Sequence, residues 1–97
     1  PINILTPIKG TPFENYGDKI DEENILRTIA IFKIVNPNSS IRLAGGKKAR
    51  LSEENIQKLM TCCIDSTITG NYLTTTGFEP SDDIKKVKIA NKTLKTI

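Results

Sequence analysis

One arginine carries the clearest chemical signal in this sequence. Arg42 lies between Ile41 and Leu43, in a short apolar stretch that runs into the glycine pair Gly45 and Gly46. The side-chain alternation of a strand places the two apolar residues on one face and the guanidinium on the other. Because an arginine cannot lose its proton and its unpaired burial is costly, the guanidinium needs a partner. That partner can be a carboxylate, a phosphate or a less ordinary group.

The residues around this strand extend the candidate site. A strand that ends in glycines and then in a lysine, here Lys47, is typical of α/β enzymes, in which strand ends hold the ligands. A phosphate site built from Gly45, Gly46 and Lys47 ranks last, because the full glycine-plus-lysine loop pattern is absent. Asn3, at the start of the chain, points either into a ligand space or toward nearby backbone, and the sequence alone favours the backbone.

The two cysteines are adjacent, at Cys62 and Cys63, and the sequence has no histidine. Adjacent cysteines do not have the spacing of zinc ligands, and a disulfide between neighbours is strained. We therefore expect two small apolar side chains at a helix end, both reduced, in a cytoplasmic protein.

Hydrophobic periodicity and turn residues divide the chain into three strand–helix pairs. Strands are expected at residues 2–8, 39–43 and 66–70, loops at 9–19 and 71–77, and helices starting after Asp21, after Ser52 and at Pro80. This alternation predicts an α/β fold of three successive β-α units, with parallel strands and right-handed crossovers, in a single domain of residues 1–97. The three units form either a small open sheet or the last part of a TIM-type (β/α)8 barrel, which needs about 250 residues.

The first and last predicted helices differ in how their apolar side chains are distributed around the helix. The first is apolar on nearly all sides after its opening turn, through Ile25, Leu26, Ile29, Ala30, Ile31, Phe32, Ile34 and Val35. Such a helix is expected to be covered on more than one face. The last helix has Ile84, Val87 and Leu94 on one side. Because a slice of barrel leaves strand edges unpaired, we also expect self-association into a dimer or a larger assembly.

Composition limits the classes of partner. With 37% apolar and 26% charged residues, the 97-residue chain falls in the ordinary globular class, and neither a signal peptide nor a membrane span is visible. The net charge is +3, and much of the basic excess lies in two clusters that are interpreted as solvated faces: Lys47, Lys48 and Arg50, then Lys85, Lys86, Lys88, Lys92 and Lys95. The second cluster has no interleaved aromatic or glycine residue, so a nucleic-acid partner is not expected. A start at Pro1 suggests a processed product or a piece of something longer.

Several stretches, in order and spacing, resemble the C-terminal portion of the biotin synthase family of radical S-adenosylmethionine (SAM) enzymes, including its biotin and thiamin synthesis associated domain. The resemblance covers nearly the whole chain. It rests on Pro1-Ile2-Asn3-Ile4-Leu5, Lys9-Gly10-Thr11-Pro12, Leu26-Arg27-Thr28-Ile29-Ala30, Arg42-Leu43-Ala44-Gly45-Gly46, and Gly70 with Leu73-Thr74-Thr75.

The resemblance implies a barrel whose last strands this chain supplies, with the rest of the barrel as its partner in the full-length protein. Arg42 matches the family's unusual arginine ligand to a two-iron two-sulfur cluster, which is the sulfur source. Asn3 matches an asparagine that contacts dethiobiotin. The implied activity of the whole enzyme is sulfur insertion between two unactivated carbons of dethiobiotin, with SAM, a 4Fe-4S cluster and the 2Fe-2S cluster as cofactors. A salt-bridged Arg42 remains the alternative.

The chain also departs from the family pattern. The Cys-x3-Cys-x2-Cys signature is absent, the cysteine pair falls where the family usually has small alanine and glycine residues, and Lys47 stands where arginine is common. Iron–sulfur clusters are held mainly by thiolates. We therefore expect no cofactor and no catalytic residue on this chain alone. The alternative to an enzyme segment is a free-standing, non-catalytic module for interaction or self-association.

Overall fold

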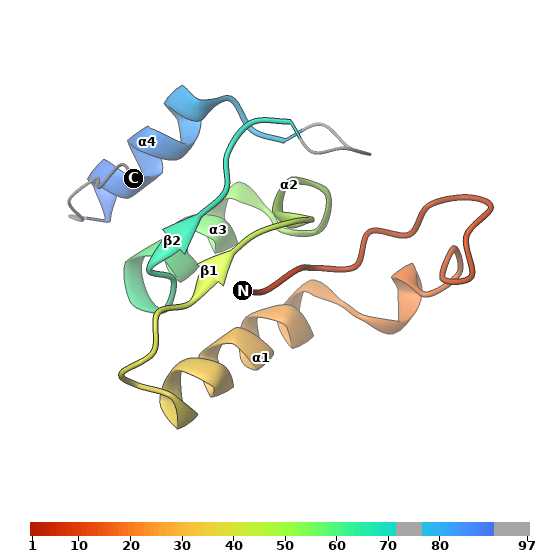
Figure 1. The fold of residues 1–97 in the computed structure, drawn as a ribbon, viewed down its shortest axis with the longest axis horizontal. Helices are drawn as coiled ribbons and strands as arrows, with labels where there is room; N and C mark the ends of the chain where they lie inside the picture. Colours follow the sequence, from red (N-terminus) through yellow and green to blue (C-terminus); the bar gives the residue numbers. More distant parts are fainter. Residues whose placement is uncertain (72–76, 91–97) are drawn as a thin grey trace.

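The computed structural model describes residues 1–71 and 77–90 (Figure 1). In chain order its elements are η1 (Gly17–Lys19), α1 (Glu22–Val35), β1 (Arg42–Leu43), α2 (Lys47–Arg50), α3 (Glu53–Cys62), β2 (Ser66–Thr67) and α4 (Pro80–Ile89). The α/β class is confirmed. No helix in these two described ranges is long and apolar enough to cross a bilayer.

The predicted helix starts are confirmed by their caps. Asp21 accepts a hydrogen bond from the N–H of Asn24 at 2.7 Å, and Ser52 accepts one from the N–H of Asn55 at 3.2 Å. Each cap satisfies a backbone donor that has no partner inside the helix. Pro80 opens α4, where its missing N–H costs nothing. The four-residue α2 directly behind the glycine pair was not predicted.

The strands are parallel, as predicted, but much shorter than predicted. β1 and β2 pair in the register Arg42 to Ser66 and Leu43 to Thr67. The predicted strand at residues 2–8 is reduced to one parallel bridge between Ile2 and Leu43, followed by a hydrogen bond from the N–H of Ile4 to the carbonyl of Gly45. Pairing stops there because β1 turns away at the glycine pair.

Helices cover one face of these parallel segments. The buried apolar side chains of Ile4, Ile41 and Leu43 join those of the helices in one core. Asn3 and Arg42 alternate with them along the chain and are exposed. In Figure 1, α3 lies behind β1 and β2, and none of the labelled helices covers the opposite face of the strands, which we call the bare face. The period-two reading of residues 41–43 is confirmed by this burial.

The expectation that α1 is covered on more than one face is wrong for this chain. Ile25 and Ile29 are buried. The C-terminal half of the helix exposes Ile31, Phe32, Ile34 and Val35, with Ile34 77% exposed. An exposed patch of four large apolar side chains on one helix is unusual for a protein surface in contact with water and indicates a surface for contact.

The last helix packs by its polar side. Asp83 and Lys86 are its buried residues, while Ile84 and Val87 are half-buried and Ile89 is exposed. The predicted apolar side is therefore not the side that faces the core. Leu94 and most of the predicted polar loop lie outside the described residues.

Candidate functional site

Arg42 lies on the bare face of the strands. Its Nε donates a hydrogen bond to the hydroxyl of Ser66, the residue opposite it in the register, at 3.3 Å. Within residues 1–71 and 77–90, its terminal nitrogens make no hydrogen bond and no carboxylate forms an ion pair with it. The salt-bridged alternative is thus not what the described part of the chain shows. The end of the guanidinium is available to a group outside it.

Asn3 lies on the neighbouring parallel segment, directly after Ile2, which pairs with Leu43. Its Oδ1 accepts a hydrogen bond from the N–H of Gly45 at 3.0 Å, so the prediction that this side chain satisfies nearby backbone is confirmed. The same bond fixes the orientation of the amide, because an N–H donor requires the oxygen and not the nitrogen. The Nδ2 group is therefore the donor that Asn3 presents to the bare face.

The glycine pair allows this arrangement. Gly46 has a φ of +87°, and a Cβ there would lie 2.1 Å from the carbonyl oxygen of Ile4. A Cβ at Gly45 would lie 3.2 Å from Oδ1 of Asn3. The turn after β1 thus comes so close to residues 3 and 4 that a side chain at position 45 or 46 would crowd those two residues.

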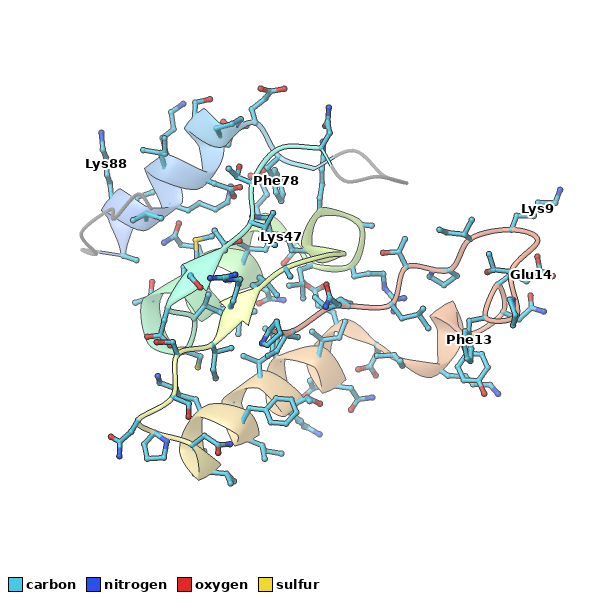
Figure 2. All side chains as sticks on the ribbon, in the orientation of Figure 1. Lys9, Phe13, Glu14, Lys47, Phe78 and Lys88 are labelled. Carbon is cyan, nitrogen blue, oxygen red and sulfur yellow. The ribbon has the colours of Figure 1, made fainter. Side chains whose placement is uncertain are left out.

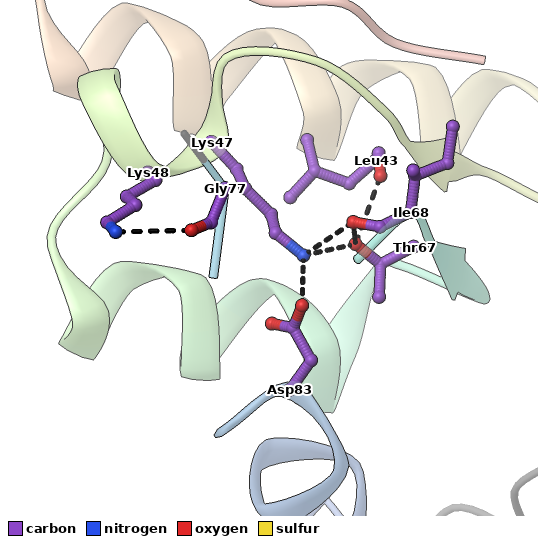
Figure 3. A network of polar contacts seen from close by, with 7 residues as sticks. All are labelled: Leu43, Lys47, Lys48, Thr67, Ile68, Gly77 and Asp83. Atoms are coloured by element: carbon purple, nitrogen blue, oxygen red, sulfur yellow. Dashed lines mark hydrogen bonds and ion pairs between the residues drawn. The ribbon is translucent and has the colours of Figure 1, made fainter. Parts of the chain in front are cut away.

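Directly behind the turn, Lys47 is fully buried, which corrects its interpretation as part of a solvated face. Its ammonium donates to Oγ1 of Thr67 at 2.8 Å, to the carbonyl of Ile68 at 2.9 Å and to Oδ2 of Asp83 at 2.8 Å (Figure 3). All three donors are used, so the group has none for a phosphate. Figure 2 places Lys47 beside Phe78, on the α4 side of the strands.

Burial of the Lys47 ammonium is unfavourable, and the carboxylate of Asp83 offsets part of this effect. Burial lowers the pKa of Lys47 below its ordinary value, and the hydrogen bond and charge of Asp83 act in the opposite direction. Asp83 uses one oxygen for the ion pair, while its buried Oδ1 has no partner in the described part of the chain. A lysine offers a point charge, whereas the fork of an arginine could engage both oxygens.

Three other basic residues of the two clusters, Arg50, Lys48 and Lys86, also contact the protein, whereas Lys85 and Lys88 are exposed as expected. Arg50 donates to the carbonyls of Leu5 at 2.8 Å and Gly17 at 3.2 Å, and also to that of Ile20. Lys48 donates to the carbonyl of Gly77 at 3.1 Å. The ammonium groups of Lys47, Lys48 and Lys86 lie 5.7, 5.6 and 4.6 Å from the ring centroid of Phe78. Lys92 and Lys95 lie outside the described residues.

Sequence reasoning did not find Asp83 or Phe78 as partners of Lys47. Asp83 has the position of an ordinary acid in the first turn of a helix, where the helix dipole favours it. Only the strand–helix alternation indicates that the first turn of α4 lies near the end of β1, because parallel strands bring their carboxyl ends to one edge of a sheet.

The cysteines do not contribute to the bare face. Neither forms a disulfide, and they end α3, which covers the other side of the strands. Across the described ranges there is no group of three or more histidine, cysteine or acidic side chains that could hold a metal.

A groove runs along the outer edge of the first segment. It has a volume of about 390 Å³ and is lined by residues 2–5 together with Asn24, Ile25, Thr28 and Ile29 of α1. The N–H groups of Ile2 and Ile4 donate to the carbonyls of Arg42 and Gly45, so by strand alternation those of Asn3 and Leu5 point to the groove. An unpaired strand edge beside an apolar helix face is the arrangement onto which a further strand adds.

Comparison with known proteins matches this chain to a family. The Biotin and Thiamin Synthesis associated domain matches residues 1–92. The chain is 48% identical over 88 residues to a protein named biotin synthase from Clostridium tetani, covering 91% of this chain and 26% of that protein. Biotin synthases of Acetivibrio thermocellus and Fusobacterium nucleatum are 43% and 44% identical over the same share of this chain, covering 27% and 24% of their lengths. The chain therefore spans about a quarter of these relatives, and it belongs to the biotin and thiamin synthesis associated domain family.

Proposed function

We propose that this chain is the C-terminal segment of a biotin synthase, the enzyme that converts dethiobiotin to biotin by radical SAM-dependent sulfur insertion. The observation that carries the proposal is the bare strand face, on which Arg42 presents a guanidinium whose terminal nitrogens have no partner in the described residues. The identity to biotin synthases of about four times the length supports it.

The open edge and the exposed helix face support a place within a larger (β/α)8 barrel. A preceding strand would pair with the free N–H groups of Asn3 and Leu5, and its helix would cover the apolar side chains near Phe32 and Ile34. The bare face then becomes the interior of the barrel. The rest of the barrel is thus the partner that this segment requires.

In this proposal Arg42 is a ligand to the two-iron two-sulfur cluster that donates sulfur. A guanidinium that binds iron does so through a nitrogen with reduced proton occupancy, which is against its ordinary chemistry. The fit to this structure is partial: Ser66 accepts a hydrogen bond from one nitrogen of Arg42, and no residue in the described ranges bonds to the terminal nitrogens. The thiolates that hold most of a cluster would come from the preceding segments.

Asn3 is proposed to bind dethiobiotin. Because Oδ1 is engaged by Gly45, the Nδ2 group is left to donate a hydrogen bond. The carbonyl of the cyclic urea of dethiobiotin is an acceptor that suits it. Arg42 and Asn3 lie on adjacent parallel segments, which supports a sulfur source and a substrate at one wall of the proposed barrel.

The segment by itself is proposed to be catalytically incomplete. Its sequence lacks the Cys-x3-Cys-x2-Cys motif that holds the 4Fe-4S cluster of radical SAM enzymes. That cluster with SAM supplies the radical that activates the substrate carbons. The residues of this chain are left to orient the substrate and the sulfur donor.

The experiment that tests the proposal joins the upstream genomic sequence to this segment. The full-length protein, reconstituted with iron and sulfide, is expected to form biotin from dethiobiotin and SAM, and the segment alone is expected to form none. A full-length protein that carries the cysteine motif and both clusters but forms no biotin would overturn the proposal.

A second candidate is a free-standing module that self-associates without catalysis. The exposed apolar face of α1 favours it, because a second copy could cover this face as well as a preceding helix could. The open reading frame separates the two candidates: a methionine directly before Pro1 indicates the module, whereas a cysteine motif upstream indicates the enzyme. Light scattering of the module would then show a dimer or a larger assembly.

A further inference from the structure

The pairing of β1 with β2 has little backbone support. Each strand has two residues, and only a few backbone hydrogen bonds join them, among them Ser66 N–H to Ile41 O at 3.2 Å and Ile68 N–H to Leu43 O at 3.1 Å. A slip by one residue would turn every side chain of a strand to the opposite face. The position of Arg42 on the bare face therefore depends on what fixes this register.

Charged side chains hold both ends of the pairing. At the N-terminal end, Oδ2 of Asp65 accepts from the N–H of Ile41 at 2.8 Å and from the ammonium of Lys33 at 3.1 Å. These groups are partly exposed to solvent. At the C-terminal end, the hydroxyl of Thr67 donates to the carbonyl of Leu43 at 3.0 Å and accepts from Lys47.

The ammonium of Lys47 links three elements at that end. Lys47 belongs to α2. Its ammonium donates hydrogen bonds to the hydroxyl of Thr67 and the carbonyl of Ile68, in and directly after β2, and forms an ion pair with Asp83 of α4 (Figure 3). Thr67 lies opposite Leu43, one step along the register from the pair formed by Arg42 and Ser66. Because alternate residues face opposite sides, a group that holds Thr67 under the sheet also sets where Arg42 stands above it.

We propose that Lys47 and Asp83 form a buried clamp that fixes the register of β1 against β2 and so acts as a positioning pair for Arg42. The inference deepens the proposed function, since its consequence for sulfur donation rests on Arg42 as a cluster ligand. The register itself does not depend on that role. The buried, unpartnered Oδ1 of Asp83 adds a specific expectation: an arginine at position 47 can keep the clamp and occupy this oxygen.

The test compares three variants of the full-length protein. The double variant K47M/D83L fills the site with apolar side chains, a replacement that proteins with buried ion pairs often tolerate, so that folding survives without the clamp. K47R retains the charge and the donors. K58M is the matched control, because Lys58 pairs with Glu54 on the surface, where their side chains are 64% and 78% exposed.

Two readouts are measured on each variant. The first is hydrogen exchange at the Ile68 amide, which bonds to Leu43, relative to the Ile56 amide, which bonds to Ser52. The second is the magnetic coupling between 15N-labelled arginine and the unpaired electron of the reduced two-iron two-sulfur cluster. In K47M/D83L we expect exchange at Ile68 to rise about tenfold or more and the coupling to weaken, while K47R and K58M stay within about threefold of the unchanged protein.

Different results separate the clamp from the role of Arg42. Exchange at Ile68 that is unchanged in K47M/D83L, or equally fast in K47R, overturns the clamp. Faster exchange with an unchanged arginine coupling overturns the positioning of Arg42 by this pair. If the unchanged protein shows no arginine coupling at all, the cluster role of Arg42 fails, and the exchange rate of Ile68 alone decides the clamp.

Discussion

The N–H of Gly45 donates a hydrogen bond to Oδ1 of Asn3 at 3.0 Å, across a separation of 42 residues in the sequence. The bond ties the first parallel segment to the turn that follows Arg42. It also decides which end of the Asn3 amide faces outward, and so which kind of ligand group the residue can recognise.

This bond predicts the effect of substituting Asn3. In the full-length protein, Asn3→Asp keeps the acceptor for Gly45 but removes the outward donor, so the affinity for dethiobiotin is expected to fall about tenfold or more. Calorimetric titration with dethiobiotin measures it. Asn15→Asp, in an exposed part of the long loop, is the matched control and should leave the affinity unchanged. Equal affinities for the two variants would contradict a substrate role for Asn3.

The close approach at Gly46 predicts a large loss of stability for Gly46→Ala. The positive φ alone costs about 1–2 kcal/mol, and the contact with the carbonyl of Ile4 adds about 1–3 kcal/mol of overpacking. Gly10→Ala is a matched control, because Gly10 has a φ of +85° with nothing within 4 Å of an added Cβ. Denaturant unfolding of both variants should show the larger loss at Gly46, and equal losses would show that the contact is relieved without cost.

Arg50 is expected to hold the long loop in place. Its guanidinium donates to the carbonyls of Leu5, Gly17 and Ile20, so Arg50→Met should raise hydrogen exchange across residues 5–20 and destabilise the protein by about 2 kcal/mol. Arg27→Met removes an arginine from an exposed ion pair with Glu23 and should cost no more than about 0.5 kcal/mol. Unchanged exchange in the loop of the Arg50 variant would be evidence against this role.

Glu22 predicts a pH dependence of stability. The backbone N–H of Ser52 and then the side-chain amide of Asn55 hold the pKa of Glu22 below its ordinary value of 4.5, and so link the starts of α1 and α3. A lowered pKa in the folded state means that this contribution is complete above about pH 4.5 and is lost as the pH falls through the folded pKa. The free energy of unfolding of Glu22→Gln should therefore approach that of the unchanged protein in acid.

The matched control for this measurement is Glu23→Gln. Glu23 is the next residue in the sequence and forms an exposed ion pair with Arg27. Its difference from the unchanged protein is expected to be small throughout. A difference for Glu22→Gln that stays constant between neutral pH and pH 3 would show that the link to Ser52 does not titrate.

The sequence was sufficient for features that depend on near neighbours. The alternation at Arg42 and the caps at Asp21 and Ser52 rest on rules that span only a few residues, and the structure confirms them. The surroundings of Lys47 were predicted wrongly for the opposite reason. Its three partners are 20, 21 and 36 residues away, and nothing in a run of lysines tells a buried ammonium from a solvated one.

The same limit explains the errors at the helices. The apolar circumference of α1 predicts cover on several sides, yet Ile34 and Val35 are exposed among the described residues. For α4, the contact of Lys86 with Phe78 and the ion pair of Asp83 with Lys47 turn the polar side inward, whereas a periodicity rule assigns that side to solvent.

We propose above that the guanidinium of Arg42 binds the sulfur-donor cluster. The most direct measurement labels arginine with 15N in the full-length protein and records pulsed electron paramagnetic resonance spectra of the reduced two-iron two-sulfur cluster. We expect a 15N coupling of a directly bound nitrogen that disappears in Arg42→Met, while Arg27→Met retains it. A reduced cluster without such a coupling, or a coupling that survives in Arg42→Met, would contradict the claim.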